Sequence, residues 1–276
     1  MKKKWLAVPY IVWMCIFIVI PLFLIGYYAV TDTTDDGSVI WSLTNLKEVF
    51  TKDNMALIWK SLKMALICTV ICLLLAYPIA LILSSKYFSD KGLLLFLFVI
   101  PMWMNFLLRT YAWRYIFEDV TWLNTFLGWF GIEPVAILFT DFAVMFGMVY
   151  NFLPFMILPI HTVLCKINPR VIEAAQDLGA NKVNVFKKVI FPLSLPGVMS
   201  GIVMVFMPAV STFVVSKLLG GGKYYLIGNI IEYYFIEAVN GWNKGAALAL
   251  VLFVIIFASM FVLNRFDKDH EGGTLM

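Results

Sequence analysis

Charged side chains are scarce in this sequence. Lysine, arginine, aspartate and glutamate make up only 14% of its 276 residues, against 62% hydrophobic residues. A soluble protein cannot cover so much apolar surface, because too few polar side chains are present to face water. Acidic residues are absent from all the long apolar runs. This second absence argues against a transporter that relays protons through carboxylates inside the membrane.

The chain also lacks the motifs of nucleotide binding and of common hydrolases. No G-x-x-x-x-G-K-[ST] stretch is present, and GGGKYY at 220–225 has neither the spacing nor the hydroxyl residue of a phosphate-binding loop. The motifs H-E-x-x-H and G-x-S-x-G are missing, and the sequence has two histidines, His161 and His270. We therefore expect a chain that is not an enzyme, does not hydrolyse ATP alone and holds no metal or other cofactor.

The four cysteines do not form the pattern of a disulfide framework. Cys15, Cys68 and Cys72 lie in apolar runs, and Cys165 ends another. Cys68 and Cys72 share a helix face at a spacing of four, but no histidine lies near them in the sequence, which argues against zinc. The net charge of +4 is small. Membrane orientation explains it without a nucleic-acid partner.

Long uncharged runs are what the sequence has instead. Six of them cover residues 5–30, 64–85, 92–108, 142–165, 189–216 and 245–264. Each is close to the roughly 20 residues that a helix needs to cross a bilayer, whereas a barrel would alternate polar and apolar residues. The third run is short, but Arg109 can extend its charged head to the interface and lengthen the helix to about Phe117. The first is too long for a signal-peptide core, so we expect a retained helix.

We therefore predict an all-α membrane protein that forms one domain over 1–276. The expected helices are about 5–30, 61–85, 92–117, 138–164, 193–217 and 244–265. The second to fifth of them contain interior prolines, at Pro78, Pro101, Pro154, Pro159, Pro196 and Pro208. Each removes a backbone hydrogen bond, and the freed carbonyl needs protein or a water-lined cavity nearby. The prolines are compatible with a cavity and equally with ordinary kinks.

Lysine and arginine in the connecting segments predict the orientation of the chain. With a cytoplasmic N-terminus, the inner segments are 1–4, 86–91, 166–188 and the tail from Arg265, which hold 12 basic and 6 acidic residues. The remaining segments hold 9 basic and 11 acidic residues, with Asp32, Asp35 and Asp36 directly after the first run. Basic residues favour the cytoplasmic side. We predict a multi-pass protein of the cytoplasmic membrane with both termini inside and with 31–60, 118–140 and 219–243 outside.

The inner segment 166–190 has a pattern of its own. Asn168 and Pro169 are typical of a helix start, and Gly179 of a helix end. Val171, Ile172, Ala175 and Leu178 form a narrow apolar stripe at helical spacing. Asn181 is suited to cap a second short helix, expected to run to Lys188. The small side chains around Gly179 favour a surface that another protein approaches closely. The three lysines that follow favour an amphipathic helix on the membrane interface.

The same segment resembles the EAA motif of the permeases of ABC importers. The motif is present as Glu173-Ala174-Ala175, then Gly179, then Val189-Ile190-Phe191-Pro192, in which valine and phenylalanine replace the family's isoleucine and leucine. The resemblance implies a type I importer permease fold with a cytoplasmic coupling helix between the fourth and fifth helices. It also implies that a cleft of an ATP-binding subunit holds Ile172, Glu173, Ala174, Ala175, Leu178 and Gly179.

Beyond this motif, nearly the whole chain is similar to the spermidine/putrescine permeases of that family. The matching stretches are NFLLRTYAW (105–113), GMVYNFLPFMILP (147–159), EAAQDLGA (173–180) and GGGKYYLIGNIIEYYF (220–235). After Ser216 the resemblance leads us to expect an acidic residue, but this chain has Lys217. That lysine argues against the attraction of a polycation to this position.

The resemblance further implies the partners of the chain. They are a dimer of ATP-binding subunits that hold ATP and magnesium, a second and related permease, an external polyamine-binding protein, and the lipid bilayer. The implied mechanism is alternating access, in which closure of the ATP-binding subunits moves the coupling loop and turns the helices. For this, the loop must make different contacts in the two states.

A linear polyamine carries ammonium groups on an apolar chain and therefore suits aromatic faces and amide oxygens. Polar or aromatic residues of the proline-containing helices are candidates for its pathway: Trp103, Asn105, Tyr150, Asn151, Ser211 and Phe213. Asp141, at the external end of the fourth helix, is suited to recruit cations. Ordinary helix packing and interfacial anchoring explain the same residues equally well.

Three other functions compete with polyamine import. The first is an importer permease of the same fold for another substrate, such as thiamine, iron or putrescine alone. The second is a secondary transporter or channel that works without ATP, against which the missing intramembrane charges and the lack of inverted repeats argue. The third is an intramembrane enzyme, for which the sequence shows no paired acid and base and no metal-binding cluster.

Overall fold

The computed structural model describes residues 8–34, 38–85, 92–130, 133, 136–222 and 224–271. The segments 1–4 and 86–91 and the pair Asp35-Asp36, on which the predicted orientation partly rests, lie outside these residues. Within the described part, five helices are long and apolar enough to cross a membrane. Helices in place of strands are expected here, since a helix satisfies all its backbone hydrogen bonds within one segment in lipid.

The first three long helices are Val8–Ala29, α4 and α8. The first spans Val8–Ala29 and consists of α1 (Val8–Met14), a π-helical turn (Cys15–Val19) and α2 (Ile20–Ala29). The second, α4, spans Lys52–Leu83, and the third, α8, spans Asp141–Leu164. The expected start of the second helix at 61 lies nine residues too late, because the outer turns of α4 carry Lys52, Asp53, Lys60 and Lys63. A search for uncharged runs excludes such turns.

The other two long helices also have bounds that differ from the expected ones. One runs from Lys182 to Ser211 through α10 (Lys182–Val185), a π-helical turn (Phe186–Ile190) and α11 (Phe191–Ser211). It begins and ends earlier than the expected 193–217, and the short helix expected to run to Lys188 is its first part. The last helix, α14, spans Trp242–Glu271.

In place of one helix over 92–117, the structure has two. Helices α5 (Gly92–Trp103) and α6 (Phe106–Glu118) meet at a bend of 98°. The Asn105 side chain causes the new start, because its Oδ1 accepts hydrogen bonds from the backbone N–H groups of Leu107 and Leu108. Arg109 does not reach the interface as predicted: α6 packs against α8 and α12, and the arginine is buried there.

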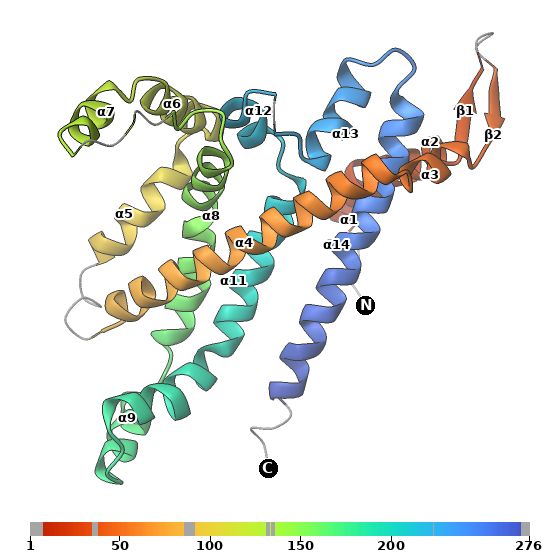
Figure 1. Ribbon diagram of the computed structural model, residues 1–276. Helices are drawn as coiled ribbons and strands as arrows, with labels where there is room; N and C mark the ends of the chain where they lie inside the picture. The colour runs from red at the N-terminus through yellow and green to blue at the C-terminus, as the bar shows by residue number, and fades with distance from the viewer. Residues whose placement is uncertain are drawn as a thin grey trace.

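Shorter elements occupy the segments between the long helices. Strands β1 (Thr31–Thr33) and β2 (Val39–Trp41) pair antiparallel, with Thr31 opposite Trp41. The short helices are α3 (Thr44–Val49), α7 (Thr121–Gly128), α9 (Pro169–Asp177), α12 (Val214–Gly220) and α13 (Ile227–Ile236). Helix α9 lies at one end of the molecule, whereas α7, α12, α13 and the hairpin lie at the other (Figure 1).

Close contact among α4, α8 and α11 forms the core. Helix α4 turns a row of small buried side chains toward its neighbours: Ala65, Cys68, Cys72, Ala76 and Ala80. On α11, Gly197 and Gly201 approach α8 so closely that a side chain at Gly197 would meet the Pro159 carbonyl oxygen at 2.9 Å. Without a hydrophobic drive between helices in lipid, small residues of this kind bring the backbones into van der Waals contact.

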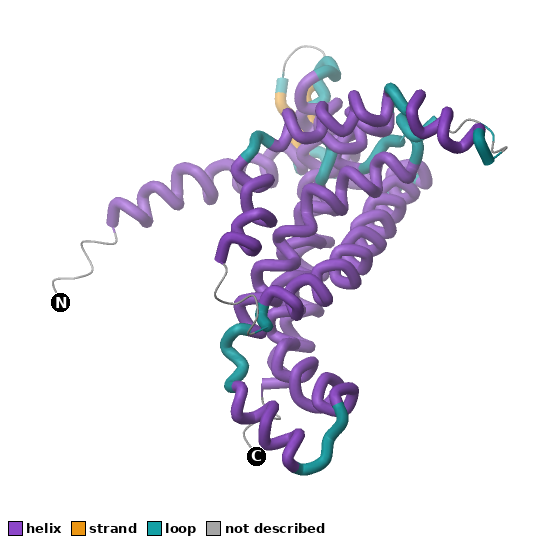
Figure 2. Tube along the Cα trace, turned by 90° about the vertical axis from the view of Figure 1, so that its left-hand side faces the viewer, coloured by secondary structure: helices purple, strands orange, loops and turns teal. Residues whose placement is uncertain are grey.

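The first helix stands apart from this core. It projects away from the other helices (Figure 2), and no residue of its most apolar window is buried. Its C-terminal end is held by Asn243 of α14, whose Nδ2 donates to the carbonyl oxygens of Tyr28 and Thr31. Lys244 adds an ion pair of 2.9 Å to Glu48 of α3.

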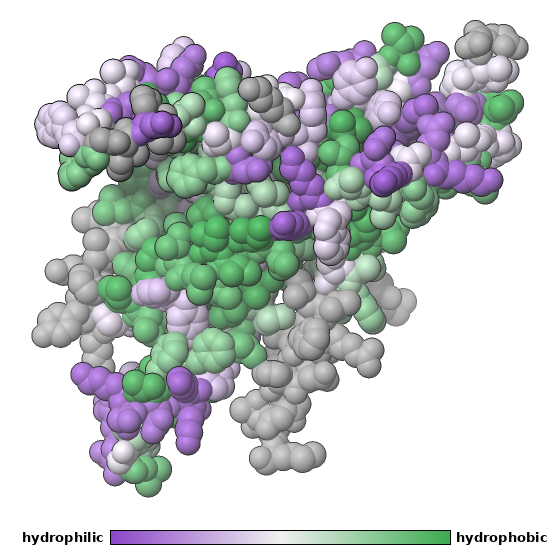
Figure 3. All heavy atoms as spheres, viewed as in Figure 1, coloured by the Kyte–Doolittle hydropathy of each residue, from purple (hydrophilic) through white to green (hydrophobic). Residues whose placement is uncertain are grey.

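Surface polarity follows the long axis of the helices. A broad apolar band covers the middle of the molecule, and hydrophilic residues gather at the α9 end and over the opposite end (Figure 3). This distribution matches a bilayer around the middle, with both polar ends in water or headgroups. Helix α9 and the group α12–α13 therefore lie on opposite sides of the membrane.

Candidate functional site

The segment with the EAA motif folds as a helix with an N-cap, as its sequence predicts. Helix α9 begins at Pro169, and the Asn168 Oδ1 accepts a hydrogen bond of 3.0 Å from the backbone N–H of Arg170. Proline at the first position costs nothing, since that N–H has no partner in a helix. The predicted start of α9 is thus confirmed. It lies five residues after the end of α8 at Leu164.

Gly179 ends the helix in a conformation that other residues rarely adopt. Its φ is +83°, its N–H donates to the Gln176 carbonyl oxygen at 2.9 Å, and the Ala180 N–H donates to the Ala175 carbonyl oxygen at 3.1 Å. A left-handed residue costs glycine little but strains any side chain that carries a Cβ. Nothing lies within 4 Å of the position of a Cβ at Gly179. The glycine is therefore required by the backbone and leaves an open surface.

The faces of α9 differ in exposure. Ile172 and Ala175 are half-buried, whereas Glu173, Ala174 and Leu178 are exposed, Leu178 to 89%. No residue of α9 is buried. The apolar stripe predicted from the sequence is therefore divided, with its middle turned to the chain and Val171 and Leu178 turned outward. An exposed leucine beside small residues and a carboxylate is a surface that another protein can cover.

A compact aromatic contact links this loop to the core. Asn181 caps α10 by accepting from the Asn184 N–H, as predicted. The π-helical turn follows, and in it Phe186 lies against Tyr77 of α4, with Phe191 also against that ring. The Tyr77 hydroxyl and the Ser194 hydroxyl of α11 share a hydrogen bond of 2.7 Å. The segment after α10 therefore contacts α4 directly and continues into α11.

The residues predicted to line a pathway do not gather at one place. Trp103 ends α5, is 75% exposed, and packs edge-on against Phe96. Asn105 uses its side-chain oxygen as the cap of α6. Asp141 is exposed in the first turn of α8, at the end of the molecule opposite α9. Trp103 and Asn105 therefore lie together at the bend between α5 and α6, whereas Asp141 lies at the N-terminal end of another helix, α8.

Tyr150 and Asn151 belong to the contact between α6 and α8. Tyr150 packs against Trp113 and Phe146, with ring centroids 5.2 and 6.5 Å away. Asn151 is buried, and its Nδ2 donates to the Gly147 carbonyl oxygen, while its Oδ1 has no hydrogen-bond partner among the described residues. Aromatic packing of this kind holds helices together, so these positions have a structural use besides the predicted one.

Ser211 and Phe213 flank the end of α11. The helix stops at Ser211, and the Phe213 carbonyl oxygen then accepts hydrogen bonds from the Lys217 N–H, the Ser216 hydroxyl and the Asn229 Nδ2. Asn229 Oδ1 in turn accepts from Ser216. This polar network fastens α12 and α13 to the end of α11. Three of these residues, Ser216, Lys217 and Asn229, also line a cavity, so the Phe213 carbonyl oxygen is hydrogen-bonded to the wall of that cavity.

That cavity was missed by the sequence-based prediction. It has a volume of about 220 Å³ and is lined by Ser216, Lys217, Gly222, Tyr224, Tyr225, Asn229, Glu232, Tyr233 and Glu237. Lys217 Nζ lies 3.0 Å from Glu232 Oε1 and 3.6 Å from Glu237 Oε1. The hydrogen bond to Glu232 raises the pKa of Lys217 above its ordinary value, so this ammonium group is charged at neutral pH. In sequence, the partners lie 15 and 20 residues apart, and nothing in the pattern joins them.

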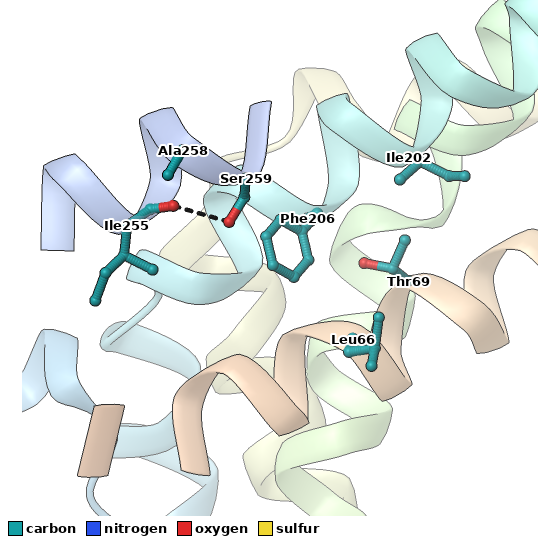
Figure 4. A pocket seen from close by; sticks show the side chains of 7 residues that line it. All are labelled: Leu66, Thr69, Ile202, Phe206, Ile255, Ala258 and Ser259. Carbon is teal, nitrogen blue, oxygen red and sulfur yellow. Dashed lines mark hydrogen bonds between the residues drawn. The ribbon is translucent and has the colours of Figure 1, made fainter. Parts of the chain in front are cut away.

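A second, larger cleft has a different character. It encloses about 480 Å³ between α4, α11 and α14 and is lined by Leu66, Thr69, Ile202, Phe206, Ile255, Ala258 and Ser259 (Figure 4). Its two hydroxyl groups donate to carbonyl oxygens of their own helices, Thr69 to Ala65 and Ser259 to Ile255. The lining residues carry no charge, and these two hydroxyl groups are their only polar side-chain groups. The cleft is suited to apolar groups.

Comparison with known proteins identifies the family. The family described as "Binding-protein-dependent transport system inner membrane component" matches residues 66–270, from the middle of α4 to the end of α14. This chain belongs to that family. It is therefore a multi-pass membrane subunit of a transport system.

Relatives of this permease cover almost its whole length. The spermidine/putrescine transport system permease protein PotB of Haemophilus influenzae is 40% identical over 262 residues, which are 93% of this chain and 91% of the relative. PotB of Escherichia coli is 37% identical over 268 residues, which are 93% of this chain and 94% of the relative. The resemblance predicted from the sequence is confirmed.

Solved structures share the fold of this permease at low identity. A chain of a bacterial ABC transporter involved in the import of the acidic polysaccharide alginate superposes with a TM-score of 0.73 at 17% identity, covering 97% of this chain and 96% of that chain. A chain of the MetNI methionine ABC transporter, in an inward-facing conformation, gives 0.60 at 16% identity, with 80% and 99% covered. The predicted type I importer permease fold is thereby confirmed.

Proposed function

We propose that this chain is the permease subunit of an ATP-driven importer that moves spermidine and putrescine across the cytoplasmic membrane. The observation that carries the proposal is the identity of up to 40% with spermidine/putrescine permeases along 93% of the chain. Such identity extends through the loop α9 and through the segment α12–α13, so it includes both ends of the helix bundle.

Coupling to ATP is assigned to the α9 loop. The chain has no phosphate-binding loop of its own, so ATP and magnesium are held by a dimer of partner ATPase subunits. Ile172, Glu173, Ala174, Ala175, Leu178 and Gly179 enter a cleft of one such subunit. Support comes from the exposure of α9 at a polar end of the molecule and from the contact of Tyr77 in α4 with Phe186 and Ser194, which lie in the helix that follows α9.

The other partners follow from the same proposal. A second, related permease completes the channel, because six spans are few to enclose a pathway. An extracytoplasmic binding protein delivers the polyamine to the end formed by α7, α12 and α13. Both termini and α9 lie in the cytoplasm, in agreement with the surplus of basic residues in the segments on that side. No nucleic acid takes part.

The substrate passes along residues that attract ammonium without holding it permanently. Aromatic faces and amide oxygens meet this need, since a ring attracts a cation through its quadrupole. We assign Asp141 to the recruitment of cations, and Trp103, Asn105, Tyr150, Asn151, Ser211 and Phe213 to the pathway. Of these, Phe213 has the best support, because its carbonyl oxygen accepts hydrogen bonds from Ser216, Lys217 and Asn229, which line a cavity with two carboxylates.

The test is ATP hydrolysis by the complete transporter in lipid vesicles. Spermidine-loaded binding protein is expected to stimulate hydrolysis by the wild-type complex. Gly179→Asp is expected to abolish the stimulation, because it adds both backbone strain and a side chain at the docking surface. Glu173→Ala is expected to weaken it. Lys244→Met, in an ion pair at the opposite end of the molecule, serves as the control and is expected to leave it unchanged.

Two results would contradict parts of the proposal separately. Stimulation by binding proteins loaded with thiamine or iron, but not with spermidine or putrescine, would leave the permease assignment and replace the substrate. Unchanged stimulation in Gly179→Asp would show that α9 is not the coupling surface.

A further inference from the structure

The cavity between α12 and α13 already holds an ammonium group, that of Lys217. Its Nζ lies 3.0 Å from Glu232 Oε1 and 3.6 Å from Glu237 Oε1, both on or just after α13. These three are the charged side chains that line the cavity among the described residues. Two carboxylates against one lysine leave the cavity with a net negative charge.

A second lysine lies over one of the aromatic rings that line the cavity. The Nζ of Lys60, on the outer part of α4, lies 5.0 Å from the centre of the Tyr224 ring. Tyr224 also lines the cavity, together with Tyr225 and Tyr233. The distance is within the range at which an ammonium group is attracted to an aromatic face. Carboxylates and rings at this site therefore both receive cations of the chain itself.

The Lys217 ammonium is held in a way that allows its release. The side chains of Lys217 and Glu237 are 52% and 54% exposed, whereas that of Glu232 is 16% exposed. Ion pairs with water access are weak, because water and salt compete with both partners. An incoming alkylammonium ion of higher charge can therefore take the place of the lysine at the more enclosed Glu232.

We propose that Glu232, Glu237 and the three tyrosines form a binding site for a linear aliphatic polyamine, and that Lys217 is a tethered competitor that occupies the site when it is empty. The inference rests on the proposed function for its substrate class. It departs from the sequence-based argument that Lys217 weighs against the attraction of a polycation to this position, because Glu232 and Glu237 outnumber the lysine.

The position of the site gives the exchange a consequence. The Lys217 N–H and the Asn229 Nδ2 both donate to the Phe213 carbonyl oxygen, at the break between α11 and α12. Gly228 lies against the carbonyl groups of Ser211 and Thr212, where a Cβ would meet the Ser211 oxygen at 2.7 Å. Departure of the Lys217 side chain thus acts on the residues that connect α13 to the end of α11. The same exchange that admits the substrate can loosen the contact between α13 and the end of α11.

The experiment measures equilibrium binding of radiolabelled spermidine to the complete transporter in lipid nanodiscs, without binding protein. Lys217→Met removes the competing charge and is expected to tighten binding by about 2- to 5-fold, the range that a surface ion pair supplies. Lys217→Arg keeps a tethered cation and is expected to bind as the wild type does. Glu232→Gln is expected to weaken binding by about 5-fold or more, since it removes the more enclosed carboxylate.

Lys244→Met is the matched control, because Lys244 forms a surface ion pair of similar exposure with Glu48 outside the cavity. It is expected to leave spermidine binding unchanged. Unchanged or weaker binding by Lys217→Met, or no measurable binding by any variant, would overturn the inference. Stimulation of ATP hydrolysis by spermidine-loaded binding protein is measured on the same preparations. If wild-type hydrolysis responds to spermidine but Lys217→Met binds no better, the inference fails and the proposed function stands. If the binding shifts occur without any response of hydrolysis, the site stands and the proposed substrate fails.

Discussion

At the scale of single residues, glycine is needed in this permease for two different reasons. Gly179 is needed for its backbone angle, because φ is +83° at a place with open space around it. Gly197 is needed for the opposite reason, since it lies in regular helix but directly against α8. A substitution by alanine therefore tests strain at one site and contact at the other.

Gly179→Ala is expected to weaken binding of the ATPase subunit to the permease by about 5- to 30-fold. The left-handed conformation costs a residue with a Cβ roughly 1–2 kcal/mol. In the free permease the variant loop therefore relaxes to another backbone conformation, and the left-handed one must be restored when the ATPase subunit binds. Binding in detergent, measured with fluorescent ATPase subunit, gives the ratio. Gly26→Ala is the control, because Gly26 also has open space but lies within regular helix α2. Equal affinity of the two variants would contradict the role given to the backbone angle.

Gly197→Ala is expected to lower the free energy of unfolding by about 1–3 kcal/mol, the usual cost of overpacking a core. The added methyl group would lie 2.9 Å from the Pro159 carbonyl oxygen and 3.0 Å from Val163, and neither group is the end of a flexible side chain. Unfolding in mixed micelles of increasing SDS content measures the change. Gly128→Ala, with nothing within 4 Å, is expected to show no loss. A Gly197 variant as stable as the wild type would mean that α8 and α11 are free to separate.

At the scale of whole elements, the proposed coupling depends on how the segment after α9 is joined to the core. The π-helical turn at Phe186–Ile190 joins α10 to α11 without a break, so α10 and α11 form one continuous helix over Lys182–Ser211. Tyr77 ties this helix to α4 through two aromatic rings and the Ser194 hydroxyl. Under the proposed function, a displacement of α10 would therefore reach the core through a continuous helix and not through a loose linker.

The hydrogen bond between Tyr77 and Ser194 is open to a double-mutant cycle. Tyr77→Phe and Ser194→Ala are each expected to cost about 0.5–1.5 kcal/mol of unfolding free energy, the net value of one hydrogen bond. The double variant should lose less than the sum of the two, because both single changes remove the same bond. Unfolding in SDS micelles gives all three values. Strictly additive losses would show that the two hydroxyl groups do not interact.

Sequence patterns predicted the long helices well because the bilayer imposes length and apolarity on each. They placed the caps of α9 and α10 at Asn168 and Asn181 for a related reason, since capping needs only neighbouring residues. The bend at Asn105 carried the same local signal, namely an asparagine that can start a helix. It was hidden because the uncharged run continues through it.

Contacts between distant residues were beyond such patterns. Lys217 meets Glu232 and Glu237 only because α13 folds back over α12, and a single lysine in place of an expected acid therefore pointed away from a cation site. Arg109 showed the same limit, since its burial depends on the 98° turn of α6 toward α8 and α12. Charge along a sequence predicts membrane sides, but charge at a site depends on how the elements close around it.

At the scale of the whole molecule, the two polar ends must lie on opposite sides of the membrane. Single cysteines at Lys182 in α10 and at Trp129 beside α7 test this in a variant whose exposed cysteines, Cys15 and Cys165, are replaced by serine. Trp129→Cys is expected to react with a membrane-impermeant maleimide from the external side. Lys182→Cys is expected to react only after the membrane is opened, because the proposed topology places α9 and α10 in the cytoplasm. The reverse pattern would invert the proposed topology and with it the direction of transport.

Asn243 fastens the first helix to the last, and the two groups that meet there are far apart in the order of synthesis. Its amide binds the Thr31 carbonyl oxygen across 212 residues of chain. At roughly 5–20 residues per second, a ribosome needs on the order of 10–40 seconds to make that length. During this interval the helix Val8–Ala29 stands in the bilayer with its outer end unfastened, stable through its own apolar surface. The helix Val8–Ala29 is thus made first but is held by Asn243 only near the end of translation. The delay gives another newly synthesised membrane protein time to contact this helix before its C-terminal end is fixed.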